Sequence, residues 1–302
     1  MVLQETHMTL QEIVNAARRK LNNYEVPYLW IDEELVYYCN EVINTICREA
    51  LPLEEQLDED VCEVYLSSGA NVYALNAAVL YVTSAKLVTE EVMTLDTAPA
   101  TDWAATDTIT GATSAITSTV VEKLTDYTYV VENRSGQYTK GEILSNGTYT
   151  ADQSSSYPIL SDYESTFLKK KEMRDITNPD WQSDDSDEPI NYILDYKSGY
   201  IAFYPTPDAC YVVRLSVYRY PTTAMTTTSM SSQTPTLDAK YHPMIVDGIV
   251  ATAFMKHGEQ TFNEKMASIY NALFNKQMSD LKRKNLQFRA TERTVNLHKG
   301  FM

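Results

Sequence analysis

The sequence predicts an α+β fold: a helical bundle built from N- and C-terminal helices, packed with an antiparallel β region and carrying a small inserted all-β module. Three observations predict it. Apolar residues recur at helical spacing near both ends of the chain, and short runs of β-branched and aromatic residues fill the middle. Residues 104–152 are rich in threonine and contain no proline or cysteine, so they stand apart from their surroundings.

Two amphipathic helices are predicted at the start of the chain. Thr9 followed by Glu12 is a capping box, and the apolar stripe that begins with Leu10 continues to Leu21. Asp32 can cap a second helix, which ends before Pro52. The region from Val61 to Leu95 then favours strands.

The inserted module and the return to the host fold follow. Within 104–152, the pairs Ser135-Gly136, Lys140-Gly141 and Asn146-Gly147 indicate turns between short strands. The host pattern resumes near Tyr157 with an expected short helix over 161–172, and strands are expected around 192–194, 200–204 and 211–218.

The end of the chain is predicted to be helical again. An apolar stripe from Ile245 to Phe254 precedes a long helix from about Thr261 to Asn285, and the remainder has no apolar period. The predicted domains are therefore a core of residues 1–103 and 153–285, an inserted β domain of residues 104–152, and an extended C-terminal tail of residues 286–302.

Composition argues against several classes of function. The net charge is −16, with an acidic first two thirds and a basic last third, which disfavours a DNA-gripping body. The histidines are isolated, and the phosphate-binding, dinucleotide and serine-hydrolase motifs are missing, so we expect no enzyme and no cofactor. No apolar run is long enough for a membrane span. Four scattered cysteines and no secretory signal suggest assembly in a reducing cytoplasm.

Tyrosine is the residue type that most suggests a contact surface. The sequence holds 22 tyrosines, and many crowd the predicted strands between residues 192 and 220. A half-buried sheet face explains such crowding, and so does an interface, where tyrosine is enriched. The candidate subunit-interface residues are Tyr200, Tyr204, Tyr218 and Tyr220.

The order of elements resembles the head-to-tail adaptor proteins of tailed bacteriophages. The resemblance rests on the two N-terminal helices, Asn178-Pro179-Asp180-Trp181, the strand end Tyr204-Pro205-Thr206-Pro207-Asp208, and Tyr241-His242-Pro243 before a helical pair. It covers residues 9–95 and 157–285. The segments Gly111-Ala112-Thr113-Ser114 and Tyr138-Thr139-Lys140-Gly141-Glu142 of the insert are similar to small β modules of phage virion proteins.

The resemblance implies a structural virion protein at the neck between capsid and tail. It implies a ring of 12 copies that binds the portal protein and a tail tube or nozzle protein and surrounds duplex DNA without specific binding. Adaptors of this kind engage the portal through their C-terminal segment. The residues implied are Lys282, Arg283, Lys284, Phe288, Arg289, Arg293 and Lys299. The alternative is a tail-associated module that binds a glycan or receptor through the β insert.

Overall fold

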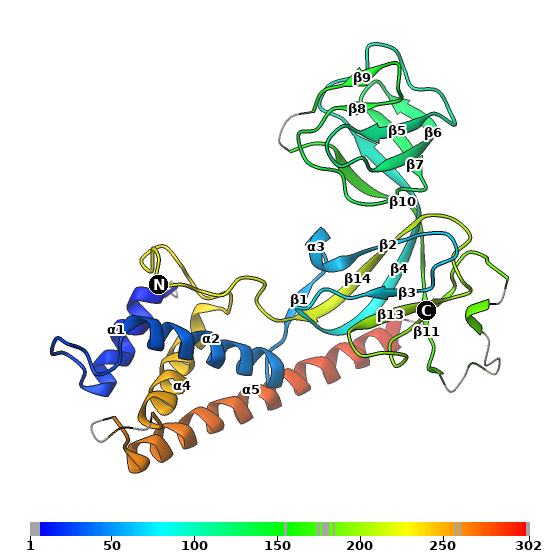
Figure 1. Cartoon of the computed structure of the whole chain (residues 1–302). Coiled ribbons are helices and arrows are strands. Elements are labelled where there is room, and N and C mark those ends of the chain that lie inside the picture. The colour runs from blue at the N-terminus through cyan, green and yellow to red at the C-terminus, as the bar shows by residue number, and fades with distance from the viewer. Residues whose placement is uncertain are drawn as a thin grey trace. The chain divides into compact units, whose positions relative to one another are not determined.

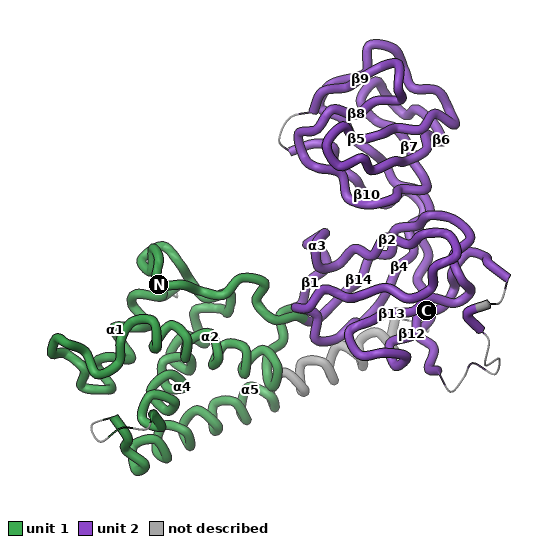
Figure 2. Tube along the Cα trace, viewed as in Figure 1, with its two compact units in different colours: residues 1–53, 219–302 green, residues 54–218 purple. Residues whose placement is uncertain are grey.

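The structure divides into two compact units (Figure 2). It is a computed structural model that describes residues 7–153, 156–173, 176, 181–183, 185–256, 258 and 261–299, with the backbone alone for residues 285–299. The helical unit comprises residues 1–53 and 219–302, and the β unit comprises residues 54–218. Each unit therefore has its own core.

Helix α4 is the centre of the helical unit (Figure 1). The four helices are α1 (Leu10–Leu21), α2 (Asp32–Glu49), α4 (His242–Phe254) and α5 (Glu264–Lys299). Helix α4 packs against the other three, so nearly all of its residues are buried and it is apolar on almost every side. The segment between the β unit and α4 contains one short 3₁₀ helix, η3 (Ala239–Tyr241).

The start of α1 confirms the predicted capping box, whereas α2 begins differently from the prediction. The Thr9 hydroxyl accepts from the Glu12 backbone N–H, and the Glu12 carboxylate accepts from the Thr9 N–H. Asp32 is the first residue of α2 and makes no capping bond; the N-cap is Ile31. The Asp32 carboxylate instead accepts from Arg18 Nη2 at 2.6 Å, which joins α2 to α1.

Helix α5 is longer than the apolar pattern predicts. It continues to Lys299 and so includes most of the segment expected to be an extended tail. Leu, Gln, Ala, Arg and Glu in that segment favour helix by intrinsic propensity, even without an apolar stripe. The side chains of this segment lie outside the described residues.

Two β layers form one part of the β unit. The first contains β2 (Glu63–Leu66), β4 (Val79–Thr94) and β14 (Tyr211–Arg219), with β1 (Leu53–Glu55) at its edge. The second has the strand order β11 (Lys169–Lys170), β12 (Asn191–Ile193), β13 (Tyr200–Tyr204) and β3 (Val72–Ala74). The strands of these layers pair antiparallel except for the parallel pair β11–β12. Both layers contribute to one apolar core, as in a β sandwich. Helix α3 (Glu59–Cys62) and the 3₁₀ helix η2 (Trp181–Ser183) accompany them.

The inserted module continues the first sheet. Its strands are β5 (Thr108–Gly111), β6 (Thr117–Thr125), β7 (Thr128–Glu132), β8 (Leu144–Ser145) and β9 (Thr150–Ala151). They extend the order β1-β14-β4-β7-β6-β5-β8-β9, and β10 (Ile159–Phe167) pairs with β4. Its core includes Met93 and Leu95 from the end of β4 and the following residue, so the module shares residues with its host.

The predicted fold class is wrong. The fold is not a helical bundle with a small β insert, because the larger unit is built on a ten-stranded antiparallel sheet, and the five α-helices among the described residues make the smaller part. The apolar residues at the chain ends have a clear helical spacing, whereas the patterns that predict strands between them are short. The sequence therefore favours helices over strands in the predicted fold class. Sheet size depends on pairing between strands far apart in sequence, which local periodicity does not report.

The expected short helix over 161–172 is also wrong. Residues Ile159–Phe167 form strand β10 and pair with Thr94–Lys86 of β4 in antiparallel register. This strand is mostly exposed and carries two acidic residues, Asp162 and Glu164, so it lacks the buried apolar face that would mark it in the sequence. Its conformation follows from its backbone pairing with β4.

Candidate interaction surfaces

The basic end of α5 is the predicted portal-binding segment, and the structure describes its first three side chains. Lys282 donates to Glu49 at 3.1 Å, and Arg283 donates to Asp280 at 3.0 Å. Lys284 is exposed. The side chains of Phe288, Arg289, Arg293 and Lys299 lie outside the described residues, although their backbone belongs to α5.

The four candidate interface tyrosines are divided between the two units. Tyr200 and Tyr204 are the end residues of β13 and lie on the same face of it, opposite Ile201 and Phe203 of the sandwich core. Tyr218 ends the β unit on β14, whereas Tyr220 belongs to the helical unit and packs against its core. All four are half-buried. The Asn178-Pro179-Asp180 stretch lies outside the described residues, and Trp181 is buried beside Tyr204.

A buried cluster of charged side chains joins the insert to its host sheet. Arg134, which follows β7, donates from Nε to Glu91 Oε2 at 2.6 Å and from Nη2 to Glu91 Oε1 at 3.0 Å. The same Nη2 donates to Glu63 Oε2 at 3.0 Å. Arg214 donates to Glu63 Oε1 at 3.0 Å and to Glu91 Oε1 at 2.8 Å. Asp162 of β10 accepts from Arg214 and pairs with Lys86.

Neighbouring groups of opposite charge favour the ionised forms of Glu63 and Arg134. Burial alone would raise the pKa of Glu63, but Arg134, the Tyr65 hydroxyl and Arg214 hold that pKa below its ordinary value. Burial would lower the pKa of Arg134, and the two carboxylates raise it instead. Each charge therefore has partners of opposite sign within hydrogen-bonding distance, which offsets the cost of its burial.

The two insert segments that resemble phage β modules meet at Glu142. Its carboxylate is buried and accepts from the Thr113 N–H, the Ser114 N–H and hydroxyl, and the Thr139 N–H. Burial raises the pKa of Glu142, but these donors outweigh that effect and lower it. A Cβ at Gly111 would lie 2.5 Å from the Glu142 carboxylate and from the Ser114 hydroxyl, so a side chain there would displace this carboxylate from its donors.

The N-terminal segment is held against α4 by a buried histidine. His242 Nδ1 accepts from the Met8 N–H at 3.0 Å, and His242 Nε2 lies 3.0 Å from the Leu237 carbonyl oxygen. The ring is therefore neutral with its proton on Nε2. Burial lowers the pKa of His242.

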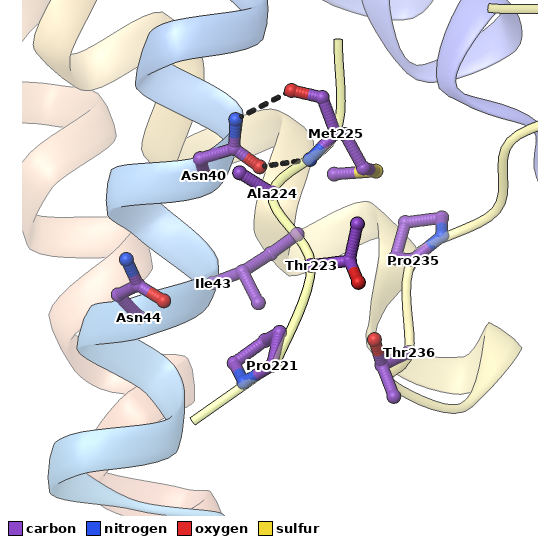
Figure 3. A pocket seen from close by; sticks show the side chains of 9 residues that line it. All are labelled: Asn40, Ile43, Asn44, Pro221, Thr223, Ala224, Met225, Pro235 and Thr236. Carbon is purple, nitrogen blue, oxygen red and sulfur yellow. Dashed lines mark hydrogen bonds between the residues drawn. The ribbon is translucent and has the colours of Figure 1, made fainter. Parts of the chain in front are cut away.

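A shallow pocket of about 80 Å³ lies between α2 and the segment 221–236 (Figure 3). Asn40 forms one wall, and its side-chain amide bonds the Met225 backbone at both atoms, at 2.9 and 3.0 Å. Further along this segment, Met230 and Gln233 accept from the first residues of α1. The pocket has room for a few waters and follows from the docking of this segment on the helices.

The described residues contain neither a candidate membrane-spanning helix nor a candidate metal site. Within them, no helix combines the length and apolar character of a bilayer span. In the same part of the chain, no group of three or more His, Cys, Asp or Glu side chains is arranged to hold a metal ion.

The family model for SU10 adaptor proteins matches residues 8–296 and so spans both units. The chain belongs to the SU10 adaptor family. Membership makes it a phage adaptor protein, a structural component of the virion that contacts other head or tail proteins. No curated protein matches the chain.

Sequence reasoning missed the charged cluster of this SU10 adaptor. Its members come from five places in the chain, and only one local signal was available: Glu63 and Arg214 each interrupt an apolar strand. These two residues are direct cross-strand partners of β2 and β14. An isolated charge within an apolar strand predicts a buried ion pair, but it does not identify the partner.

Proposed function

We propose that this chain is a head-to-tail adaptor that forms a ring between the portal protein and the tail at the virion neck. The observation that carries the proposal is the family match, because it includes the terminal helices as well as the β unit. In this proposal the ring has 12 copies, assembles in the host cytoplasm and contacts a tail tube or nozzle protein on its other side.

The basic end of α5 is the proposed portal contact. Lys282, Arg283 and Lys284 precede a segment that holds Arg289, Arg293 and Lys299, on a chain of net charge −16. Concentrated positive charge on an otherwise acidic protein suits an acidic partner surface and accelerates encounter with it. Phe288 would add an apolar anchor.

Duplex DNA passes through the proposed ring without specific binding. The acidic body supports this, because phosphate contacts with basic side chains supply most of the affinity of proteins for DNA. Gel shift with duplex DNA in about 150 mM salt, where screening is already strong, tests it. We expect free DNA at micromolar protein, and sub-micromolar binding would contradict a passive channel.

The alternative, a glycan- or receptor-binding insert, has weaker support. It requires exposed aromatic side chains near polar groups. The insert has four tyrosines, and two of them, Tyr129 and Tyr138, are core residues. Tyr127 and Tyr149 remain accessible. We therefore retain the adaptor ring as the proposed function and test it by sedimentation of the chain with portal rings of the same phage.

A further inference from the structure

The loop between α1 and α2 exposes apolar side chains although its backbone is firmly held. The exposed fractions of Tyr24, Val26, Leu29 and Ile31 are 61%, 78%, 42% and 49%. We call these four residues, with Glu25 and Glu33, the loop face. Such a concentration of exposed apolar surface on a small unit marks an interaction site.

Buried polar bonds fix the conformation of this loop. Asn23 is buried, donates to the Trp30 carbonyl at 3.1 Å and accepts from the Leu29 N–H at 3.0 Å. Arg18 donates to the same carbonyl at 2.9 Å, and Trp30 Nε1 donates to the Ala253 carbonyl at 3.0 Å. The loop face is thus preorganised, which reduces the entropy lost on binding.

Helix α5 carries a second exposed apolar stripe. Its buried stripe, which includes Ala267, Phe274 and Met278, packs against α4. Ile269 and Leu273 are 52% and 40% exposed and lie one helical turn apart on the other side of α5. By the same helical spacing, the exposed Lys265 and Lys276 share that side. These four residues form the α5 face.

The two faces point in different directions and differ in charge. Helix α4 lies between α1 and α2 on one side and α5 on the other, so the outer side of α5 faces away from α1 and α2 (Figure 1). The loop face has Glu25 and Glu33, and the α5 face has Lys265 and Lys276. Within the described part of the chain, none of these four side chains makes an ion pair.

We infer that the loop face of one copy binds the α5 face of the next copy. Two different complementary faces on one subunit make a head-to-tail contact, which closes into a ring when the rotation between copies allows it. The exposed apolar residues supply the buried area, and the opposite charges set the orientation. This inference rests on the proposed ring and names the surfaces that hold it together.

Disulfide cross-linking tests the contact directly. In a Cys210→Ser background, Val26→Cys and Leu273→Cys chains are mixed, assembled on portal rings and oxidised. We expect dimers that contain one chain of each kind, and a chain with both substitutions should give a ladder of covalent multimers. Phe167→Cys in place of Val26→Cys is the matched control, since Phe167 is exposed apolar surface of the β unit, and it should give no ladder.

The outcomes separate the inference from the proposed function. Rings that form on the portal without cross-links, or with dimers of Val26→Cys chains alone, would overturn the inference and leave the ring intact. Failure of the unsubstituted chain to assemble on portal rings would overturn both.

Charge reversal gives an independent readout of the same contact. Glu33→Lys or Lys276→Glu alone should raise the protein concentration needed for half-assembly about tenfold, because each places like charges opposite each other. The two substitutions together should restore assembly. Unchanged assembly of both single variants, or no recovery in the double variant, would overturn the inferred contact between the loop face and the α5 face.

Discussion

Arg134 binds both carboxylate oxygens of Glu91, at 2.6 and 3.0 Å, in a buried site. Arg134 follows strand β7 of the insert, and Glu91 lies on β4, the strand that runs from the host sandwich into the insert (Figure 1). A bidentate pair of this kind fixes the relative orientation of the two groups. The insert is therefore joined to its host by a buried ion pair as well as by the continuous chain.

Loss of one partner of this pair should be costly. Arg134→Ala leaves Glu91 and Glu63 buried with less positive charge beside them, and we expect a loss of about 3–5 kcal/mol in the free energy of unfolding. Urea denaturation followed by circular dichroism measures it. Arg283→Ala is the control, because Arg283 makes an exposed ion pair of similar length, and it should cost at most about 1 kcal/mol. Similar losses in both variants would contradict a structural role for the cluster.

Removal of the insert should destabilise the β unit. Replacing residues 104–152 by a Gly-Ser linker removes Arg134 and the apolar partners of Met93, Leu95 and Trp103. We expect an earlier, separate melting transition of the β unit, with the helical signal at 222 nm retained because that unit has its own core. A single melt at the temperature of the intact chain would show that the insert is energetically independent.

The local elements of this chain were more predictable than its architecture. The capping box at Thr9 and Glu12 and the helix from Ile245 to Phe254 depend on neighbours in sequence, and the structure confirms both, although α4 is buried on almost every side and not along one stripe. Strand β4 was recognised only as part of a strand region, because its pairing with β7, β10 and β14 involves residues far apart along the chain. Local periodicity cannot report such pairing, so the β unit was underestimated.

The candidate contact residues show the same limit. The basic run Lys282–Lys284 was visible as charge, and its side chains lie at the surface or in ion pairs there. The loop face was not recognised, since Tyr24, Val26 and Ile31 look like core residues in a sequence. Only packing shows that Trp30 enters the core and that its neighbours remain exposed.

Acid should weaken the helical unit before the β unit. The pKa of His242 lies below 6.5 in the fold, so below that pH the unfolded chain takes up a proton that the folded chain resists, and stability falls. The lowered pKa values of Glu63 and Glu142 have the same sign, but their effect begins only near 4.5. In thermal melts between pH 7.5 and 3.5, we expect the melting temperature of the helical unit to fall first and that of the β unit to fall at lower pH.

Two histidine variants identify the source of the first loss. His242→Gln removes the titrating ring, so the decline in stability below pH 6.5 should disappear. His7→Gln replaces an exposed ring 5.8 Å away and should retain it. A decline that persists in His242→Gln would assign the effect to another group.

Truncation after Asn285 should abolish portal binding with little effect on folding. The buried residues of α5 end at Leu281 among the described side chains, so removal of residues 286–302 spares the helical core. Co-sedimentation with portal rings and a thermal melt measure the two effects. Lys240→Ala, which removes an exposed cation elsewhere, is the control. Undiminished docking of the truncated chain would place the portal contact on another surface.

Electron microscopy of the purified chain mixed with portal rings of its phage tests the adaptor ring most directly. The proposal predicts a closed ring of 12 copies seated on one end of each portal, with a central channel wide enough for duplex DNA. Bare portal rings beside unassembled chains, at concentrations that saturate other neck proteins, would contradict it.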